Sequence, residues 1–236
     1  MNERVAGAVA SLEDPPLPVP SERVFADRRD AGRRLAALLE RFADERPVVV
    51  GMARGGVPVA AEVARALSAP LDVALVRKIG APHNPEYALG AVAEGGVCLL
   101  DDAVVHDTGL SERGARTLVA RAEGELSAQA KRYRAGREPL SLTGRTAILV
   151  DDGLATGRSA RAAIRSLRRR GAVRVILAVP VGAPESSRAL RAEADEVICV
   201  QAPELLWAVG VWYEDFAPTG DEEVAALLAH ARAGGA

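Results

Sequence analysis

Short apolar runs alternate with longer amphipathic segments along most of this chain. The apolar runs predict strands at Val48–Val50, Leu71–Val76, Ala147–Val150, Val173–Val179 and Glu196–Val200. Helical spacing of apolar residues predicts helices at Asp27–Ala43, Val57–Leu67, Ser111–Arg134, Ala160–Arg170, Pro184–Arg191 and Asp221–His230. This alternation predicts an α/β fold with a doubly wound parallel sheet, whose strands are joined by right-handed helical crossovers.

Four other segments complete the predicted organisation. Residues 1–20 end in a proline-rich stretch and are expected to form a loosely ordered leader. The core would span residues 21–204, with an inserted long helix at 111–137 and a closing lid at 80–96. Pro82, Asn84 and Pro85 argue against regular structure in the lid, although Gly95-Gly96 predicts a two-residue hairpin turn between apolar runs at 88–93 and 97–100. Residues 205–236 would form a C-terminal hood segment and a helix.

Composition and charge exclude several classes of function. A net charge of −2 over 236 residues gives no basic field for nucleic acid. The longest apolar run, Val175–Val181, is too short to span a bilayer, and Met1–Ser11 has no continuous apolar core typical of a secretory signal. Cys98 and Cys199 each lie in an apolar run, so we expect buried, reduced thiols and a cytoplasmic protein.

The clearest chemical signal follows the strand at Ala147–Val150. Asp151 and Asp152 end the strand abruptly, and a loop of small and hydroxylated residues then leads to the next helix: Gly153, Leu154, Ala155, Thr156, Gly157, Arg158 and Ser159. Two neighbouring carboxylates are costly to bury without partners, so they are expected at the open end of the strand, facing a ligand. The glycines let backbone N–H groups converge on an anion at the helix N-terminus. This pattern suits a ligand with hydroxyls and a phosphate, such as a ribose 5-phosphate.

This run resembles the phosphoribosyl-diphosphate (PRPP) binding motif of the type I phosphoribosyltransferases. The resemblance implies that Asp151 and Asp152 are catalytic and position the ribose hydroxyls, reaching Mg²⁺ only indirectly, and that Gly153–Ser159 anchor the 5-phosphate. Two other interpretations compete. A P-loop would need one more residue and a lysine where Arg158 stands. An ordinary strand-to-helix turn with an exposed aspartate pair is the other.

Two further strand ends carry related chemistry. The turn Gly51–Gly56 lacks the spacing of a dinucleotide-binding fingerprint. By the family resemblance, Ala53, Arg54, Gly55 and Gly56 would bind the diphosphate, although a tight turn with a surface arginine is the plain alternative. After the second strand, the resemblance makes Lys78 a catalytic residue that holds the leaving diphosphate, with Arg77 as a weaker candidate. His83, in the lid, is expected to be a surface residue rather than a general base.

Aromatic residues are only 3% of the chain, yet four of them lie at 205–216. Phosphoribosyltransferases carry a variable hood that selects the base partly by stacking, so Trp212 is a candidate for contact with the acceptor. Packing of the terminal helix against the sheet is the alternative. No acceptor-specific signature is present, and the chain looks like a group of phosphoribosyltransferases whose acceptor is unassigned.

The resemblance therefore implies a Mg²⁺-dependent transferase of nucleotide metabolism. It would move 5-phosphoribosyl from PRPP to a base or other nitrogen acceptor and release diphosphate. A regulatory protein that senses PRPP or a nucleotide without turnover, or a sugar-phosphate hydrolase, remains an alternative. We expect small-molecule partners, no nucleic acid and no membrane, and the inserted helix could serve a homodimer.

Overall fold

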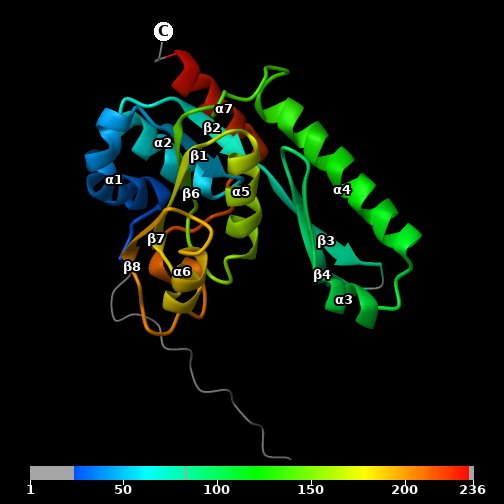
Figure 1. Ribbon diagram of the computed structural model, residues 1–236. Coiled ribbons are helices and arrows are strands. Elements are labelled where there is room, and N and C mark those ends of the chain that lie inside the picture. Colours follow the sequence, from blue (N-terminus) through cyan, green and yellow to red (C-terminus); the bar gives the residue numbers. More distant parts are fainter. Residues whose placement is uncertain (1–23, 83, 234–236) are drawn as a thin grey trace, which may run out of the picture.

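A five-stranded parallel sheet forms the centre of the computed structural model, which describes residues 24–82 and 84–233 (Figure 1). Its order is β2-β1-β6-β7-β8, and its strands are β1 (Val48–Met52), β2 (Leu71–Ala74), β6 (Thr146–Val150), β7 (Arg174–Val181) and β8 (Glu196–Gln201). The predicted parallel α/β sheet is confirmed. The leader expected at 1–20 and His83 lie outside the described residues.

Helices cover both faces of this sheet. They are α1 (Arg28–Leu39), α2 (Gly56–Ala66), α5 (Arg158–Arg169), α6 (Pro184–Leu190) and α7 (Asp221–Ala233), with 3₁₀ helices η1 (Glu40–Glu45) and η2 (Val209–Trp212). Val49 and Ile148 pack in the apolar cluster with α1, α2 and α7, whereas Val50 and Leu149 pack in the cluster with α5. The strands β1 and β6 are therefore buried on both faces, which explains their apolar sequences.

A second, antiparallel sheet projects from the core as a wing (Figure 1). It contains β3 (Val76–Ala81), β4 (Asn84–Ala93) and β5 (Val97–Leu100), followed by α3 (Asp102–Asp107) and the inserted helix α4 (Glu112–Tyr133). The strand predicted at 71–76 is divided, because β2 belongs to the central sheet and β3 to the wing.

The expectation of an irregular lid at 80–96 is wrong, because residues 84–93 form the longest strand of the wing. Apolar residues at alternate positions, including Ile79 on β3 and Leu89 on β4, are buried and stabilise this hairpin. The last β4–β5 pair is Ala93 with Val97, so the turn has three residues rather than the two expected. Gly95 and Gly96 both have positive φ, which the tight turn requires.

A buried ionic cluster joins the wing to the core. Arg134, at the end of α4, donates from Nε to Oδ1 of Asp72 at 2.9 Å and from Nη1 to Oε1 of Glu94 at 2.6 Å. Arg170 donates to the other Asp72 oxygen at 2.9 Å, so its guanidinium is mostly buried at the end of the arginine-rich helix α5. Burial raises the pKa of Asp72, but Arg134 and Arg170 outweigh that effect and hold it below the usual value.

The two cysteines are free, but only partly as expected. Cys98 is exposed on β5, where Val97 takes the inward position of the alternation, and Cys199 is half-buried. None of the helices in the described part of the chain has the length and apolarity needed to span a bilayer.

Candidate active site

The aspartate pair lies at the carboxyl edge of the central sheet, immediately after β6. The backbone N–H of Asp152 donates to Oδ1 of Asp151 at 2.9 Å, and Nε of Arg28 donates to Oδ2 of Asp152 at 2.9 Å. Burial and the neighbouring Asp152 carboxylate raise the pKa of Asp151 well above its usual value. Burial also raises the pKa of Asp152, although Arg28 opposes the shift.

Arg28 is fixed by the segment that follows β8. Its Nη1 donates to the carbonyl oxygen of Ala217 at 2.7 Å, and its guanidinium lies 3.9 Å from the centroid of the Phe216 ring. The hydroxyl of Tyr213 donates to the backbone oxygen of Asp152 at 2.6 Å. The segment 213–217 therefore contacts the acid pair in two ways. Tyr213 binds the backbone of Asp152 directly, and Ala217 and Phe216 fix the Arg28 side chain that pairs with the Asp152 carboxylate.

Sequence reasoning did not identify Arg28 and Tyr213 as site residues. Arg28 was included only in a predicted helix, and Tyr213 was one member of an aromatic cluster. The one sequence feature that points to Tyr213 is its clustering with Phe216 in a chain that is otherwise poor in aromatic residues. No local pattern indicates that Arg28 lies beside Asp152, 124 positions away.

The glycine turn after β1 packs directly against the acid pair. A Cβ atom at Gly55 would lie 1.9 Å from Oδ2 of Asp152, and one at Gly56 would lie 2.6 Å from the backbone oxygen of Val150. Because β1 and β6 are neighbouring parallel strands, their two end loops share this edge. Residues without side chains are thus required at 55 and 56.

The other two residues of that turn are placed differently. Ala53 donates its N–H to the backbone oxygen of Ala74 at 3.0 Å, and the Ala53–Arg54 peptide bond is cis. The Arg54 side chain pairs with α7 instead, since its Nη1 lies 3.8 Å from Oδ1 of Asp221.

The loop Gly153–Ser159 is the predicted phosphate cradle. Gly157 has φ +73° and caps α5, a conformation that L residues with side chains rarely adopt. Leu154 is buried in the core and exchanges backbone hydrogen bonds with Val181 and Ala183 at 2.8 Å, so its side chain is unavailable to a ligand. Ala155 and Thr156 are exposed, which leaves the backbone of the loop open to an anion.

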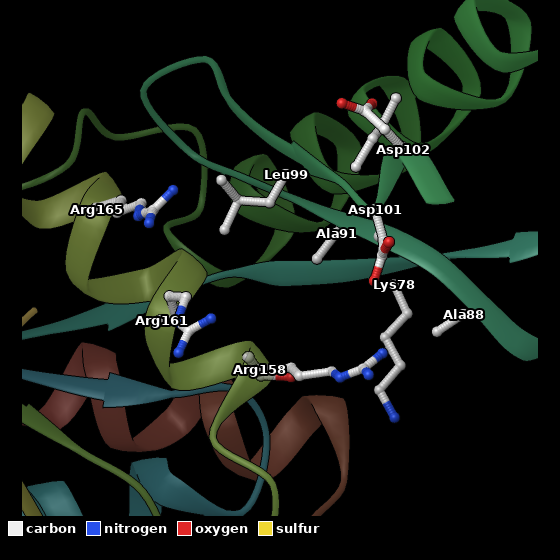
Figure 2. Close-up of a pocket in the computed structure, with 12 residues that line it drawn as sticks. Lys78, Ala88, Ala91, Leu99, Asp101, Asp102, Arg158, Arg161 and Arg165 are labelled. Carbon is white, nitrogen blue, oxygen red and sulfur yellow. The ribbon is translucent and has the colours of Figure 1, made fainter. Parts of the chain in front are cut away.

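A cavity of about 460 Å³ lies between the wing sheet and α5 (Figure 2). Its lining residues are Lys78, Ala88, Gly90, Ala91, Leu99, Leu100, Asp101, Asp102, Arg158, Ser159, Arg161 and Arg165. Lys78 and Arg158 reach it from β3 and α5, whereas Arg161 and Arg165 pair with Glu193. Arg77, the next residue on β3, points to the opposite face and pairs with Glu125 of α4. The alternation of the strand therefore separates Lys78 from Arg77.

The hood segment, predicted at residues 205–236, packs on the loop Gly153–Ser159. A Cβ at Gly153 would lie 2.3 Å from Val209 of η2, so this 3₁₀ helix is packed tightly onto the loop. Trp212 is partly buried against the apolar cluster that contains Phe25 and Tyr213, whereas Trp207 is 55% exposed. The terminal helix α7 packs instead against α2, β2 and α4.

The predicted residues thus gather in two groups. The acid pair, residues 53–56 and residues 153–157 share the carboxyl edge of the sheet, and Lys78, Arg158 and Ser159 line the adjoining cavity. Among the described residues, no cluster of three or more histidine, cysteine or acidic side chains could hold a metal ion. Two carboxylates fit Mg²⁺ only if ligand or water oxygens complete its coordination.

Comparison with known proteins identifies the family. The model of the phosphoribosyl transferase domain matches residues 26–216. The chain belongs to this family. Two curated Mycobacterium tuberculosis proteins, named provisionally as phosphoribosyl transferases, are 47% identical over 206 residues, or 87% of this chain. The chain spans 46% of the length of these relatives.

A solved structure shares the fold of this phosphoribosyl transferase domain over most of the chain. The crystal structure of TT1426 from Thermus thermophilus has a TM-score of 0.74 and 45% identity, and covers 87% of this chain and 98% of that one. A uracil phosphoribosyltransferase of Lactobacillus delbrueckii subsp. bulgaricus is 44% identical over 59 residues, which are 25% of this chain and 28% of that protein.

Proposed function

We propose that this phosphoribosyl transferase domain moves the 5-phosphoribosyl group of PRPP to a nitrogen acceptor and releases diphosphate. The observation that carries the proposal is the direct packing of Gly55 on Asp152, which joins the two loops expected to hold diphosphate and ribose. An ordinary strand-to-helix turn would not need such close approach of a glycine to a buried carboxylate.

Different residues would bind the phosphate, the ribose and the diphosphate of PRPP. Backbone N–H groups of residues 155–159, at the N-terminus of α5, bind the 5-phosphate, since the N–H of Leu154 already donates to Val181. Asp151 and Asp152 orient the ribose hydroxyls and stabilise positive charge developing at the ribosyl carbon. That charge favours the ionised form of Asp151, whose pKa is raised in the free protein. Lys78 and Arg54 neutralise the leaving diphosphate.

Magnesium completes the proposed ligand set. It would be held by diphosphate and ribose oxygens, with Asp151 and Asp152 acting through those hydroxyls or through water. When bound, the ion would offset negative charge on the diphosphate. No residue of the chain needs to form a covalent intermediate, because positioning and electrostatic stabilisation suffice.

The acceptor is a base or another nitrogen compound that would bind beside the hood and the acid pair. Val209 against Gly153 and Tyr213 on the Asp152 carbonyl support this position, since both are hood residues in direct contact with the segment proposed to bind the ribose. Trp212 remains our candidate for stacking, and its packing on Tyr213 would supply a rigid support. We also infer a role in nucleotide metabolism. The free thiols of Cys98 and Cys199 support a place in the cytoplasm, where cysteines stay reduced. The same proposal includes a homodimer formed through α4.

A panel of bases and amines with PRPP and Mg²⁺, read by diphosphate release, tests this function. We expect release to require one acceptor class and to fall by roughly 100-fold or more in Asp151→Asn. Asp107→Asn, an exposed site on α3, is the matched control and should match wild type. PRPP binding without product from any acceptor would favour a sensing protein, and slow release without acceptor would favour a hydrolase.

A further inference from the structure

Asp221, the first residue of α7, joins three elements that lie far apart in the sequence. Its Oδ1 accepts a hydrogen bond from the Tyr133 hydroxyl at 2.5 Å, and its Oδ2 lies 3.1 Å from Nη2 of Arg132. Both partners belong to the last turn of α4. Arg54, from the glycine turn, approaches Oδ1 within 3.8 Å.

The carboxylate of Asp221 is held in place mainly by α4. Tyr133 is only 2% exposed, and its hydroxyl also accepts from Nε2 of Gln129 at 2.9 Å. This network fixes the position of Asp221 without help from Arg54. Contacts with the inserted helix therefore fix the negative charge of Asp221, on α7, beside the glycine turn.

Arg54 differs from Asp221, because its backbone is hydrogen-bonded whereas its side chain is half exposed and only loosely paired. The carbonyl oxygen of Arg54 accepts from the N–H of Val57 at 3.1 Å, at the start of α2. Its side chain is 51% exposed, and the 3.8 Å separation from Asp221 is longer than a direct hydrogen bond. Such an exposed pair is weak and can be exchanged for another anion.

We propose that Asp221 is a positioning residue that holds the Arg54 side chain away from the diphosphate site until ligand binds. This inference rests on the proposed function, since it gives Arg54 the diphosphate as its second partner. Arg54 would leave Asp221 and turn to the diphosphate, whose charge exceeds that of one carboxylate. Asp221 thus lowers affinity for the diphosphate group, and α4, through Tyr133, sets how strongly.

Calorimetric binding of inorganic diphosphate, and separately of PRPP, in the presence of Mg²⁺ tests the proposal. Asp221→Asn and Asp221→Ser both remove the charge but keep a side chain suited to a helix start. Each should tighten diphosphate binding by roughly two- to five-fold, the size expected for loss of a weak competing ion pair. Glu222→Gln, the adjacent exposed residue of α7, controls for the loss of one negative charge and should leave affinity unchanged.

A double mutant separates this role from a purely structural one. In an Arg54→Ala background, Asp221→Asn should no longer change the affinity for diphosphate. Unchanged or weaker binding in both Asp221 variants, or tightening that persists without Arg54, would overturn the inference. If wild type binds neither diphosphate nor PRPP, the proposed function itself fails, an outcome distinct from equal binding by wild type and variants.

Discussion

Nε of Arg28 donates a 2.9 Å hydrogen bond to Oδ2 of Asp152, from the start of α1 to the end of β6. Both side chains are mostly buried, with 12% and 17% exposure, so neither can be replaced easily by water. Arg28 is itself held by Ala217 and Phe216. The charge and the orientation of a predicted catalytic carboxylate thus depend on two segments outside the PRPP-binding motif.

Replacing Arg28 tests this dependence. Arg28→Gln should cost about 1–3 kcal/mol of unfolding free energy, because the Asp152 carboxylate loses a charged partner. It should also raise the pKa of Asp152 further, moving the acidic limb of the pH–activity profile to higher pH. Arg29→Gln, the exposed neighbour on α1, should change neither property. An unchanged acidic limb in Arg28→Gln would show that Arg28 does not control Asp152.

Replacing Asp151 should change the stability of the protein and its activity in opposite directions. Its folded-state pKa is raised by burial and by Asp152 above the ordinary 3.8, so the folded state binds the proton more tightly than the unfolded state. Wild type therefore loses stability as pH rises from 3.8 through the raised pKa. Asp151→Asn should be more stable than wild type at neutral pH, although its transfer activity is lost.

The measurement is denaturant unfolding of both proteins at several pH values. The stability gain of Asp151→Asn should disappear below pH 3.8, where the wild-type carboxyl is neutral in both states. A gain that is the same at every pH would contradict the assigned cause.

The close approach of Gly55 to Asp152 predicts a sharp steric effect. Gly55→Ala would place a Cβ 1.9 Å from Oδ2 of Asp152, so the carboxylate must move away from Arg28. Diphosphate release should fall by roughly 100-fold. Gly124→Ala, on α4, meets nothing within 4 Å and should stabilise the protein by about 0.5–1 kcal/mol with full activity. Full activity in Gly55→Ala would separate Asp152 from catalysis.

Breaking the ionic cluster between the wing and the core should lower the free energy of unfolding substantially. Arg134→Met would leave Asp72, which is fully buried, with only Arg170 as a cationic partner, at a cost of about 3–5 kcal/mol. Arg113→Met, at an exposed position of the same helix, should be near neutral. Because the pKa of Asp72 is lowered, its contribution is present above pH 3.8 and is lost as pH falls through the folded-state value. Urea unfolding at neutral and acidic pH checks both statements.

Hydrogen exchange tests whether the wing closes over the site. PRPP with Mg²⁺ should slow exchange in β3 and β4, because Lys78 and the adjoining cavity gain an anionic partner. Mg²⁺ alone should give no protection. Protection confined to α4 would assign closure to the inserted helix instead of the hairpin.

The amino-acid sequence by itself determined the features that depend on local chemistry. Unbroken apolar runs predicted the parallel strands, because such strands are buried on both faces. The need for glycine at 157 is also a local property, because the backbone there has φ +73°, which side-chain-bearing residues rarely adopt. The helix predicted from Ser111 is also found, and Ser111 caps it by accepting from the N–H of Gly114 at 3.2 Å.

Only the tertiary structure decided which long-range partners these residues meet. The prolines near residue 82 suggested a loop, but pairing with β3 and β5 supplies β4 with hydrogen bonds that no local pattern reveals. Strand alternation sends Lys78 to the cavity and Arg77 to Glu125, once β3 leaves the central sheet. Arg28 reaches Asp152, and Arg54 reaches Asp221, across chain separations over which sequence periodicity carries no information. Propensity and spacing act over a few residues, whereas charge pairing at a site depends on how whole elements pack.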